Sequence, residues 1–450
     1  MKLSERVLSW STSNSYRWRR HLHSRGRRLL LQFGLPWGTA LLVGLIAVLY
    51  ARWSDQAYAQ FMRLQAPHPW LPLLLTPACA MLGVWLTRRW FSGSEGSGIP
   101  QVIAALHAPN DPSLMRRLFG LRVVVGKLGI SLLGLLGGMS LGREGPTVHI
   151  GAAVMAETRR FYPHQSPQLQ RQLLLAGAAA GLSAAFNTPL AGVIFAIEEL
   201  ARDFQSRTNS TMLTAVVFAG LTSLALAGNY LYFGQLSVQA ELTPALLLPV
   251  LAAAALCTLV GAAFNWTLLQ RQRWMPAPLL RWRSQRPLLY GLLLGLAIAA
   301  LGIASGGLTW GSGYAQARQL LAGDPAIGAA FAPLKWLAMV LSYMVGIAGG
   351  LFSPSLAIGA GLAQWLHLLF HATPLPLLIA LCMTGYLAAI TQSPLTSFII
   401  VMEMTNGSAM VLPLMATALL AARLAGLLVP PLYDALAHAN YAPRKAVARP

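Results

Sequence analysis

Long apolar runs with few charges decide what this 450-residue chain can fold into. Hydrophobic residues make up 56% of the sequence and charged residues 10%, whereas a typical soluble domain is about 25% charged. So few charged side chains cannot coat a soluble protein of this size, which excludes an ordinary soluble enzyme. Because about 20 apolar residues cross a bilayer, the sequence predicts an all-α polytopic membrane protein. The long runs cover residues 31–52, 70–87, 121–141, 212–233, 243–268, 287–305, 329–349, 355–371, 374–391 and 408–429.

Shorter apolar pieces, broken by Gly and Pro, lie between the long runs. Most are too short to span a bilayer, and broken backbone at membrane depth is tolerated only inside protein or around a watery cavity. We therefore expect broken helices to build the functional site. These pieces cover residues 100–107, 146–156, 173–186, 189–201 and 394–404.

The charges are lopsided, with 33 Lys and Arg against 13 Asp and Glu. A strongly basic chain suggests nucleic acid, but the positive mean hydropathy favours a multi-pass protein in a lipid bilayer, with no nucleic acid partner. Residues 1–28 hold eight basic groups and one acid, and no cleavage pattern typical of a signal peptide follows. The positive-inside rule predicts that this end and the basic tail are both cytoplasmic. The Arg-rich start is a solvated topology signal or a segment that binds anionic lipid.

These features divide the chain into three parts. We expect a basic cytoplasmic segment over 1–30, a transmembrane domain over 31–433 with halves near 31–233 and 243–433, and a short cytoplasmic tail over 434–450. Only 17 residues follow Tyr433, too few for a soluble regulatory domain.

The two halves contain an internal repeat. REGPTVHIGAA (143–153) matches LFSPSLAIGAG (351–361) at an offset of 208, and PLAGVIFAIEE (189–199) matches PLTSFIIVMEM (394–404) at an offset of 205. In transporters built from repeats, the binding site lies where the two halves meet.

Three Gly/Pro-rich turns each precede an apolar helix: GSGIP at 96–100, GREGP at 142–146 and GGLFSP at 349–354. A helix N-terminus carries a partial positive charge and unpaired N–H donors, so it attracts anions. Several such ends aimed at one point would bind an anion without a full positive charge. The alternative is three ordinary helix breaks in a membrane bundle.

Four of the 13 acidic residues lie in apolar or Gly-rich context. A carboxylate within the membrane costs free energy, so a functional role is the first hypothesis for each. Glu144 sits in the GREGP turn, where it is either a titrating group or a helix cap. Glu198 and Glu199 close an apolar run, and adjacent positions need not share a role. Glu403, like Lys127, is interpreted as a structural buried charge.

Other candidate chemistry is weak. Cys79, Cys257 and Cys382 lie in apolar runs and predict neither a disulfide framework nor a metal site. His367 and His371 are spaced i, i+4 without a third ligand, and no P-loop motif occurs. No cofactor or metal is expected, and an intramembrane enzyme lacks a nucleophile with its base.

Taken together, the turns and the glutamates resemble the CLC family of chloride channels and proton/chloride antiporters. GSGIP, GREGPTVHIG, AAFNTPLAGVIFAIEE, GGLFSPSLAIG and PLTSFIIVMEMT occur in the family's order from about residue 40 to Tyr433. The resemblance implies an all-helical inverted repeat of two halves, a homodimer, and residence in a bacterial inner membrane. It also implies chloride and protons as the transported ions.

The resemblance assigns roles to individual residues. It implies Glu144 as the gating glutamate and Glu199 as the internal proton-transfer glutamate. An acidic residue at the position of Glu199 favours an exchanger over a passive channel. A voltage- or pH-gated chloride channel of the same fold stays open as the alternative. Gln101 and Ile103 occupy positions that are often charged in relatives, which leaves proton coupling open. The implied chloride-binding residues are Ser97, Gly98, Ile99, Gly145, Leu351, Phe352 and Tyr433.

Overall fold

The computed structural model describes residues 30–201, 210–228, 231–236, 244–323 and 327–441. The described residues form helices, and their β contacts are two isolated bridges, between Gly96 and Ala348 and between Gly142 and Gly350. The Arg-rich start and the end of the tail lie outside the described residues.

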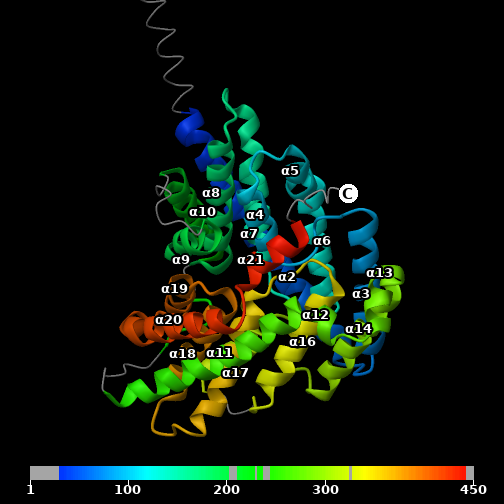
Figure 1. The fold of residues 1–450 in the computed structure, drawn as a ribbon, viewed down its shortest axis with the longest axis vertical. Helices are drawn as coiled ribbons and strands as arrows, with labels where there is room; N and C mark the ends of the chain where they lie inside the picture. Colours follow the sequence, from blue (N-terminus) through cyan, green and yellow to red (C-terminus); the bar gives the residue numbers. More distant parts are fainter. Residues whose placement is uncertain (1–29, 202–209, 229–230, 237–243, 324–326, 442–450) are drawn as a thin grey trace, which may run out of the picture.

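Figure 1 shows most helices of the first half in the upper part of the view and most helices of the second half in the lower part. The first half contains α2 (Leu35–Gln65), α3 (Pro72–Arg89), α4 (Ile99–His107), α5 (Pro112–Phe119), α6 (Leu121–Leu136), α7 (Glu144–Glu157), α8 (Pro167–Phe186), α9 (Pro189–Phe195), the π-helical turn η3 (Ala196–Ala201) and α10 (Ser210–Ala227). The second half contains α11 (Leu247–Leu269), α12 (Arg271–Trp274), α13 (Ala277–Gln285), α14 (Pro287–Ala304), α15 (Tyr314–Leu321), α16 (Phe331–Val345), α17 (Phe352–His367), α18 (Leu375–Thr391), α19 (Pro394–Thr405), α20 (Val411–Leu428) and α21 (Leu432–Tyr441).

Five helical stretches of the described residues are long and apolar enough to cross a membrane: Leu35–Gln65, Pro112–Leu136, Pro244–Leu269, Pro287–Ala304 and Ser408–Leu428. Shorter apolar helices lie between them, at Thr211–Ala227, Phe331–Val345, Leu375–Thr391 and Pro394–Thr405. This mixture of long and short apolar helices is what the broken runs of the sequence predicted.

The repeat extends to the packing of the helices. In the first half α8 packs against α7, α9 and α10, and in the second half α18 packs in the same way against α17, α19 and α20. Likewise, α2 packs on α10 in the first half and α11 packs on α20 in the second. The contact of α3 with α6 matches that of α14 with α16. The two halves also interlock, because α3 packs along α14 and α9 meets α19. The residues of the internal sequence repeat therefore occupy equivalent positions in two similar helix bundles.

Two boundaries differ from those that the apolar runs predicted. The first run was expected to end at Arg52, but α2 continues to Gln65. Two of its three charged residues have partners on distant segments: Arg52 donates to the Leu226 carbonyl at 2.6 Å, and Asp55 forms an ion pair with Arg143. The short piece predicted at 173–186 is the end of the 20-residue helix α8, whose first turn is polar and capped by Ser166.

Buried small and apolar residues fill the interior. All three cysteines are free and buried, as predicted. Close helix contacts use glycine, since small residues let membrane helices approach each other. A Cβ on Gly151 of α7 would collide with the Gly177 carbonyl of α8, and a Cβ on Gly177 would collide with the Gly151 carbonyl. This crossing fixes the position of α7, whose first residue is Glu144.

Candidate functional site

The three Gly/Pro-rich turns meet in the middle of the fold, although they are far apart in the sequence. The Gly96 amide donates to the Ile347 carbonyl at 2.9 Å, and the Gly349 amide donates back to Gly96 at 3.1 Å. Gly142 and Gly350 exchange two backbone hydrogen bonds, at 2.8 and 2.7 Å. These bonds bring the N-terminal ends of α4, α7 and α17 to one place, as the sequence interpretation expected.

Two glycines are required where α4 and α7 begin. Gly98 has φ of +105°, and a Cβ there would lie 2.6 Å from the His149 Cβ of α7. At Gly145, a Cβ would collide with the Ser97 hydroxyl. Only glycine tolerates both the left-handed backbone and this close approach. The Ser97 hydroxyl is therefore held against the first turn of α7.

Ser97 and Tyr433 form the inner part of the site. Both are buried, and the Tyr433 phenol lies close to the Ser97 hydroxyl without a hydrogen bond of good geometry between them. The Ser97 hydroxyl has no hydrogen-bond partner among the described residues. A buried polar group without a partner costs free energy, so an anion between the two hydroxyls would supply the missing acceptor.

The first residues of α17 complete this inner part. Leu351 caps the helix and Phe352 begins it, and both are buried. The Phe352 ring stacks on that of Tyr433, with centroids 5.9 Å apart and planes 9° apart. The first N–H groups of a helix have no partner within it. The predicted residues Ser97, Gly98, Ile99, Gly145, Leu351, Phe352 and Tyr433 thus surround the converging helix ends.

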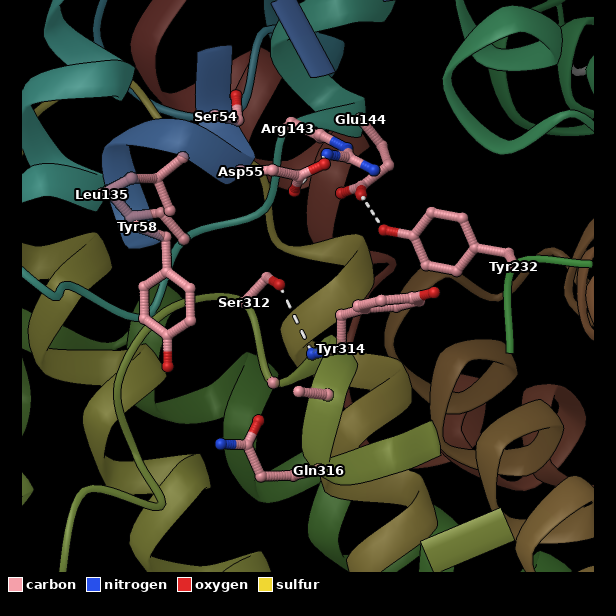
Figure 2. A pocket seen from close by; sticks show the side chains of 13 residues that line it. Ser54, Asp55, Tyr58, Leu135, Arg143, Glu144, Tyr232, Ser312, Tyr314 and Gln316 are labelled. Carbon is pink, nitrogen blue, oxygen red and sulfur yellow. Dashed lines mark hydrogen bonds and ion pairs between the residues drawn. The ribbon is translucent and has the colours of Figure 1, made fainter. Parts of the chain in front are cut away.

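Glu144 is the first residue of α7 and is fully buried. Its Oε1 accepts a hydrogen bond from the Tyr232 hydroxyl at 3.2 Å and another from the Ser353 hydroxyl. Its Oε2 has no partner among the described residues. Figure 2 shows Tyr232 reaching the carboxylate from a segment between α10 and α11. Two hydroxyls therefore hold one oxygen, while the other is left for a further ligand.

A cavity of about 120 Å³ lies on one side of Glu144. Arg143 also lines it, with its guanidinium 2.7 Å from the Asp55 carboxylate and 5.8 Å from the centre of the Tyr232 ring. Figure 2 shows this charge beside Glu144 and the α15 residues across the space. The lining residues are Ser54, Asp55, Tyr58, Leu135, Leu141, Arg143, Glu144, Tyr232, Ser312, Gly313, Tyr314, Ala315 and Gln316.

The adjacent residues Glu198 and Glu199 have different partners. Glu199 is buried in η3, a π-helical turn, and accepts a hydrogen bond from the Ser393 hydroxyl. Its charge acts electrostatically on the buried Tyr433 phenol. Glu198 instead accepts from the backbone amides of Leu395 at 3.0 Å and Thr396 at 2.6 Å. Glu198 therefore caps α19. Short π-helical turns such as η3, which holds both glutamates, are frequent at functional sites.

Glu403 mirrors Glu198 across the repeat. It accepts hydrogen bonds from the backbone amides of Leu190 at 3.2 Å and Ala191 at 2.7 Å, at the start of α9. Each half therefore supplies the carboxylate that caps a helix of the other half. This arrangement supports the structural interpretation of Glu403 and gives Glu198 the same role.

We expect Glu198→Gln and Glu403→Gln each to lower the free energy of unfolding by about 1–2 kcal/mol, because each removes a charged helix cap. Thermal unfolding of the purified protein in detergent measures this loss. Glu157→Gln is the matched control, since its ion pair with Arg160 is exposed and such pairs contribute about 0–1 kcal/mol. Unchanged unfolding in both cap variants would contradict the structural role.

Two buried lysines support the loops that lead into helices. Lys127 donates to the carbonyls of Glu95 at 3.3 Å and Gly96 at 3.1 Å, just before α4. Lys335 donates to the carbonyls of Thr309 at 3.0 Å and Gly311 at 2.6 Å, just before α15. The two lysines are 208 residues apart, which is the repeat offset. Lys127 is thus a structural charge, as interpreted, and Lys335 is its counterpart.

Sequence reasoning missed several of these partners. Ser353, within GGLFSP, and Tyr232 hold Glu144, and Ser393 holds Glu199. A signal for Lys335 existed, because it stands at the repeat offset from Lys127 and near a second Gly-Ser-Gly, at 311–313. Near the site, the Gln101 amide donates to the Glu95 carbonyl at 2.6 Å, so it supports the same loop as Lys127.

Helix ends that meet inside a bundle of apolar helices, around buried hydroxyls and carboxylates, define a membrane transport protein. A family model described as voltage gated chloride channel matches residues 79–426. The chain therefore belongs to the CLC family, with its all-helical fold of two inverted halves. Members of this family are transporters, so the prediction that the chain is not an enzyme is confirmed.

Named relatives match most of the chain. An H(+)/Cl(−) exchange transporter ClcA of Klebsiella pneumoniae subsp. pneumoniae is 31% identical over 400 residues, covering 84% of this chain and 80% of that protein. ClcA of Salmonella arizonae is 32% identical over 385 residues, covering 81% and 78%.

Solved structures share the fold. A slow cyanobacterial Cl⁻/H⁺ antiporter superposes with a TM-score of 0.76 at 25% identity, covering 91% of this chain and 97% of that one. A CLC-type fluoride/proton antiporter superposes with a TM-score of 0.77 at 22% identity, covering 90% and 97%.

Proposed function

We propose that this protein exchanges chloride for protons across the membrane, with Glu144 as the gate and Glu199 as the internal proton-transfer group. The observation that carries the proposal is that two buried carboxylates, Glu144 and Glu199, both act electrostatically on the buried Tyr433 phenol. The relatives named as H(+)/Cl(−) exchange transporters support the choice of ions. An exchanger needs one pathway that admits an anion and a group on that pathway that takes up a proton.

Chloride binds at the converging helix ends. The hydroxyls of Ser97 and Tyr433 donate to it, together with the backbone amides at the start of α17. The residues of this site are Ser97, Gly98, Ile99, Gly145, Leu351, Phe352 and Tyr433. Partial charges and hydroxyls hold the ion without a full positive charge, which lets it leave again. Arg143, which is paired with Asp55, lies beside the cavity at Glu144.

Proton uptake opens the pathway at Glu144. The ionised carboxylate imitates an anion and competes with chloride at the end of the pathway next to the cavity. Protonation neutralises it, so the side chain can leave its hydroxyl partners and chloride can take its place. The proton reaches or leaves Glu144 by way of Glu199. Chloride and protons thus travel in opposite directions through partly separate routes.

A passive chloride channel of the same fold is the alternative. The Glu199 carboxylate favours the exchanger, because a passive channel needs no second proton acceptor buried in the protein. The structural similarity to a fluoride/proton antiporter concerns the fold alone. By resemblance to the family, the serine at position 97 favours chloride as the anion, and its hydroxyl is buried at the helix ends.

Chloride and proton movements measured together in liposomes test the proposal. Exchange of an anion for a cation moves net charge, so potassium with valinomycin is included to collapse the voltage. We expect chloride efflux down its gradient to drive proton uptake in a fixed ratio. Chloride efflux without proton movement would establish the channel instead, and absence of any chloride flux would contradict both.

The placement and assembly of the chain are part of the proposal. The bacterial relatives and the basic segments support a bacterial inner membrane with both termini cytoplasmic. The segments 1–30 and 434–450 then flank a transmembrane domain over 31–433, and α21 carries the first part of the tail as far as Tyr441. We propose a homodimer, by resemblance to the family, with a separate pathway in each protomer.

A further inference from the structure

A second cluster of polar side chains lies where α4 ends against α21. His107 is the last residue of α4, and Asp434 and His438 lie on α21. One ligand atom from each of the three residues lies within 4.8 Å of the other two. The rings of His107 and His438 stack, with centroids 5.7 Å apart and planes 23° apart. Two imidazoles and one carboxylate thus face a common point.

The two helices hold these groups in place. Asp434 and His438 are four residues apart, so they share one face of α21. That face packs along α4, and Figure 1 shows α21 lying across the middle of the molecule beside α4. The cluster therefore joins two elements that are more than 300 residues apart in the sequence, which is why spacing in the sequence gave no sign of it.

The ligand set suits a zinc-class divalent ion. Zinc binds imidazole nitrogen and carboxylate oxygen at about 2.0–2.2 Å, so tetrahedral ligand atoms lie about 3.4 Å apart. The present spacing of up to 4.8 Å closes by small side-chain rotations. His107 and His438 are exposed, so their rings can turn and an ion can reach them. Water would fill the fourth position.

We propose that His107, Asp434 and His438 bind a zinc-class divalent metal ion that ties α4 to α21 and slows transport. Both helices also carry the inner part of the site. Ser97 precedes α4 and Tyr433 stands next to Asp434, while the nine residues of α4 place His107 only about 12 Å from the start of the helix. An ion that ties the end of α4 to α21 restrains the two hydroxyls that hold chloride.

Metal binding is measured first, because it does not depend on the proposed function. Zinc sulfate is titrated into the full-length protein in detergent by calorimetry, and cobalt(II) reports coordination by its visible absorption. We expect one ion per protomer at this site. Changes in outer-shell partners alone typically cost 10–100-fold in metal affinity, so His107→Ala and His438→Ala should each weaken binding at least about tenfold.

His371→Ala is the matched control. His367 and His371 also form a ring pair, with centroids 5.8 Å apart, but they lack a third His, Cys or carboxylate ligand among the described residues. Binding in this variant should equal that of the wild type. Equal zinc affinity in the wild type, His107→Ala and His438→Ala would overturn the site.

The effect on transport rests on the proposed function and is measured separately. Zinc should slow chloride flux in wild-type liposomes and leave flux unchanged in His438→Ala, provided the ion reaches the face that carries the cluster. Zinc is therefore applied to each side of the membrane in turn. Binding at the cluster without slower flux from either side would overturn the link to the pathway. If the wild type moves no chloride at all, the proposed function fails, while the binding measurement still decides the site.

Discussion

Replacing Glu144 with alanine is expected to leave chloride flux in liposomes and to reduce the accompanying proton movement to the level of protein-free vesicles. The carboxylate is fully buried, is held by Tyr232 and Ser353, and borders the cavity beside Arg143. Alanine removes both the group that blocks the anion pathway and the group that accepts the proton. Chloride can then pass without a protonation step, so the two fluxes separate.

The matched control for this change lies on the same helix. Glu157→Ala removes an exposed carboxylate at the far end of α7 and should keep both fluxes at their wild-type ratio. Thermal unfolding of each variant in detergent establishes that it is folded before flux is measured. Proton movement that persists in a folded Glu144→Ala protein, in its wild-type ratio to chloride, would remove Glu144 from the gate.

Replacing Glu199 with glutamine is expected to suppress proton movement at least about tenfold more than chloride movement. Glutamine keeps the size of the side chain and can still accept a hydrogen bond from the Ser393 hydroxyl. Its amide, unlike a carboxylate, cannot take up and release a proton. The anion pathway at Ser97 and Tyr433 is unchanged. The ratio of the initial proton and chloride rates in the same liposomes measures the effect.

Glu198 offers a matched control for Glu199, because the two residues are adjacent yet have different partners. Glu198 caps α19, so Glu198→Gln should lower stability while the ratio of protons to chloride stays at the wild-type value. Equal loss of both fluxes in Glu199→Gln would point to a structural role for that carboxylate. A changed ratio in Glu198→Gln would show that the two positions share the proton route.

Much of the fold could be predicted because the bilayer restricts it. Long apolar runs predicted the spanning helices, and Gly and Pro predicted the breaks that meet at the site. The two echoes at offsets of 208 and 205 predicted related halves, and the structure shows matched helix packing and the matched caps of Glu198 and Glu403. The apolar runs, the helix breaks and the repeat can all be read directly from the order of the residues.

Partners across the fold could not be predicted in the same way. Tyr232 reaches Glu144 from a segment 88 residues away, and Ser393 reaches Glu199 across 194 residues. A single hydroxyl leaves no periodic mark, so only the three-dimensional arrangement identifies it. The extension of α2 past Arg52 was missed for a related reason, since the partners of two of its charged residues lie on distant segments.

The most direct test of the account is whether a chloride gradient drives protons uphill in liposomes that contain the wild-type protein. Vesicles are loaded with high chloride, their voltage is clamped with potassium and valinomycin, and a small opposing proton gradient is imposed. The account predicts that chloride efflux drives protons into the vesicles against their gradient, and that dissipating the chloride gradient stops this movement. Chloride efflux that leaves the protons to run only down their own gradient would contradict coupled exchange.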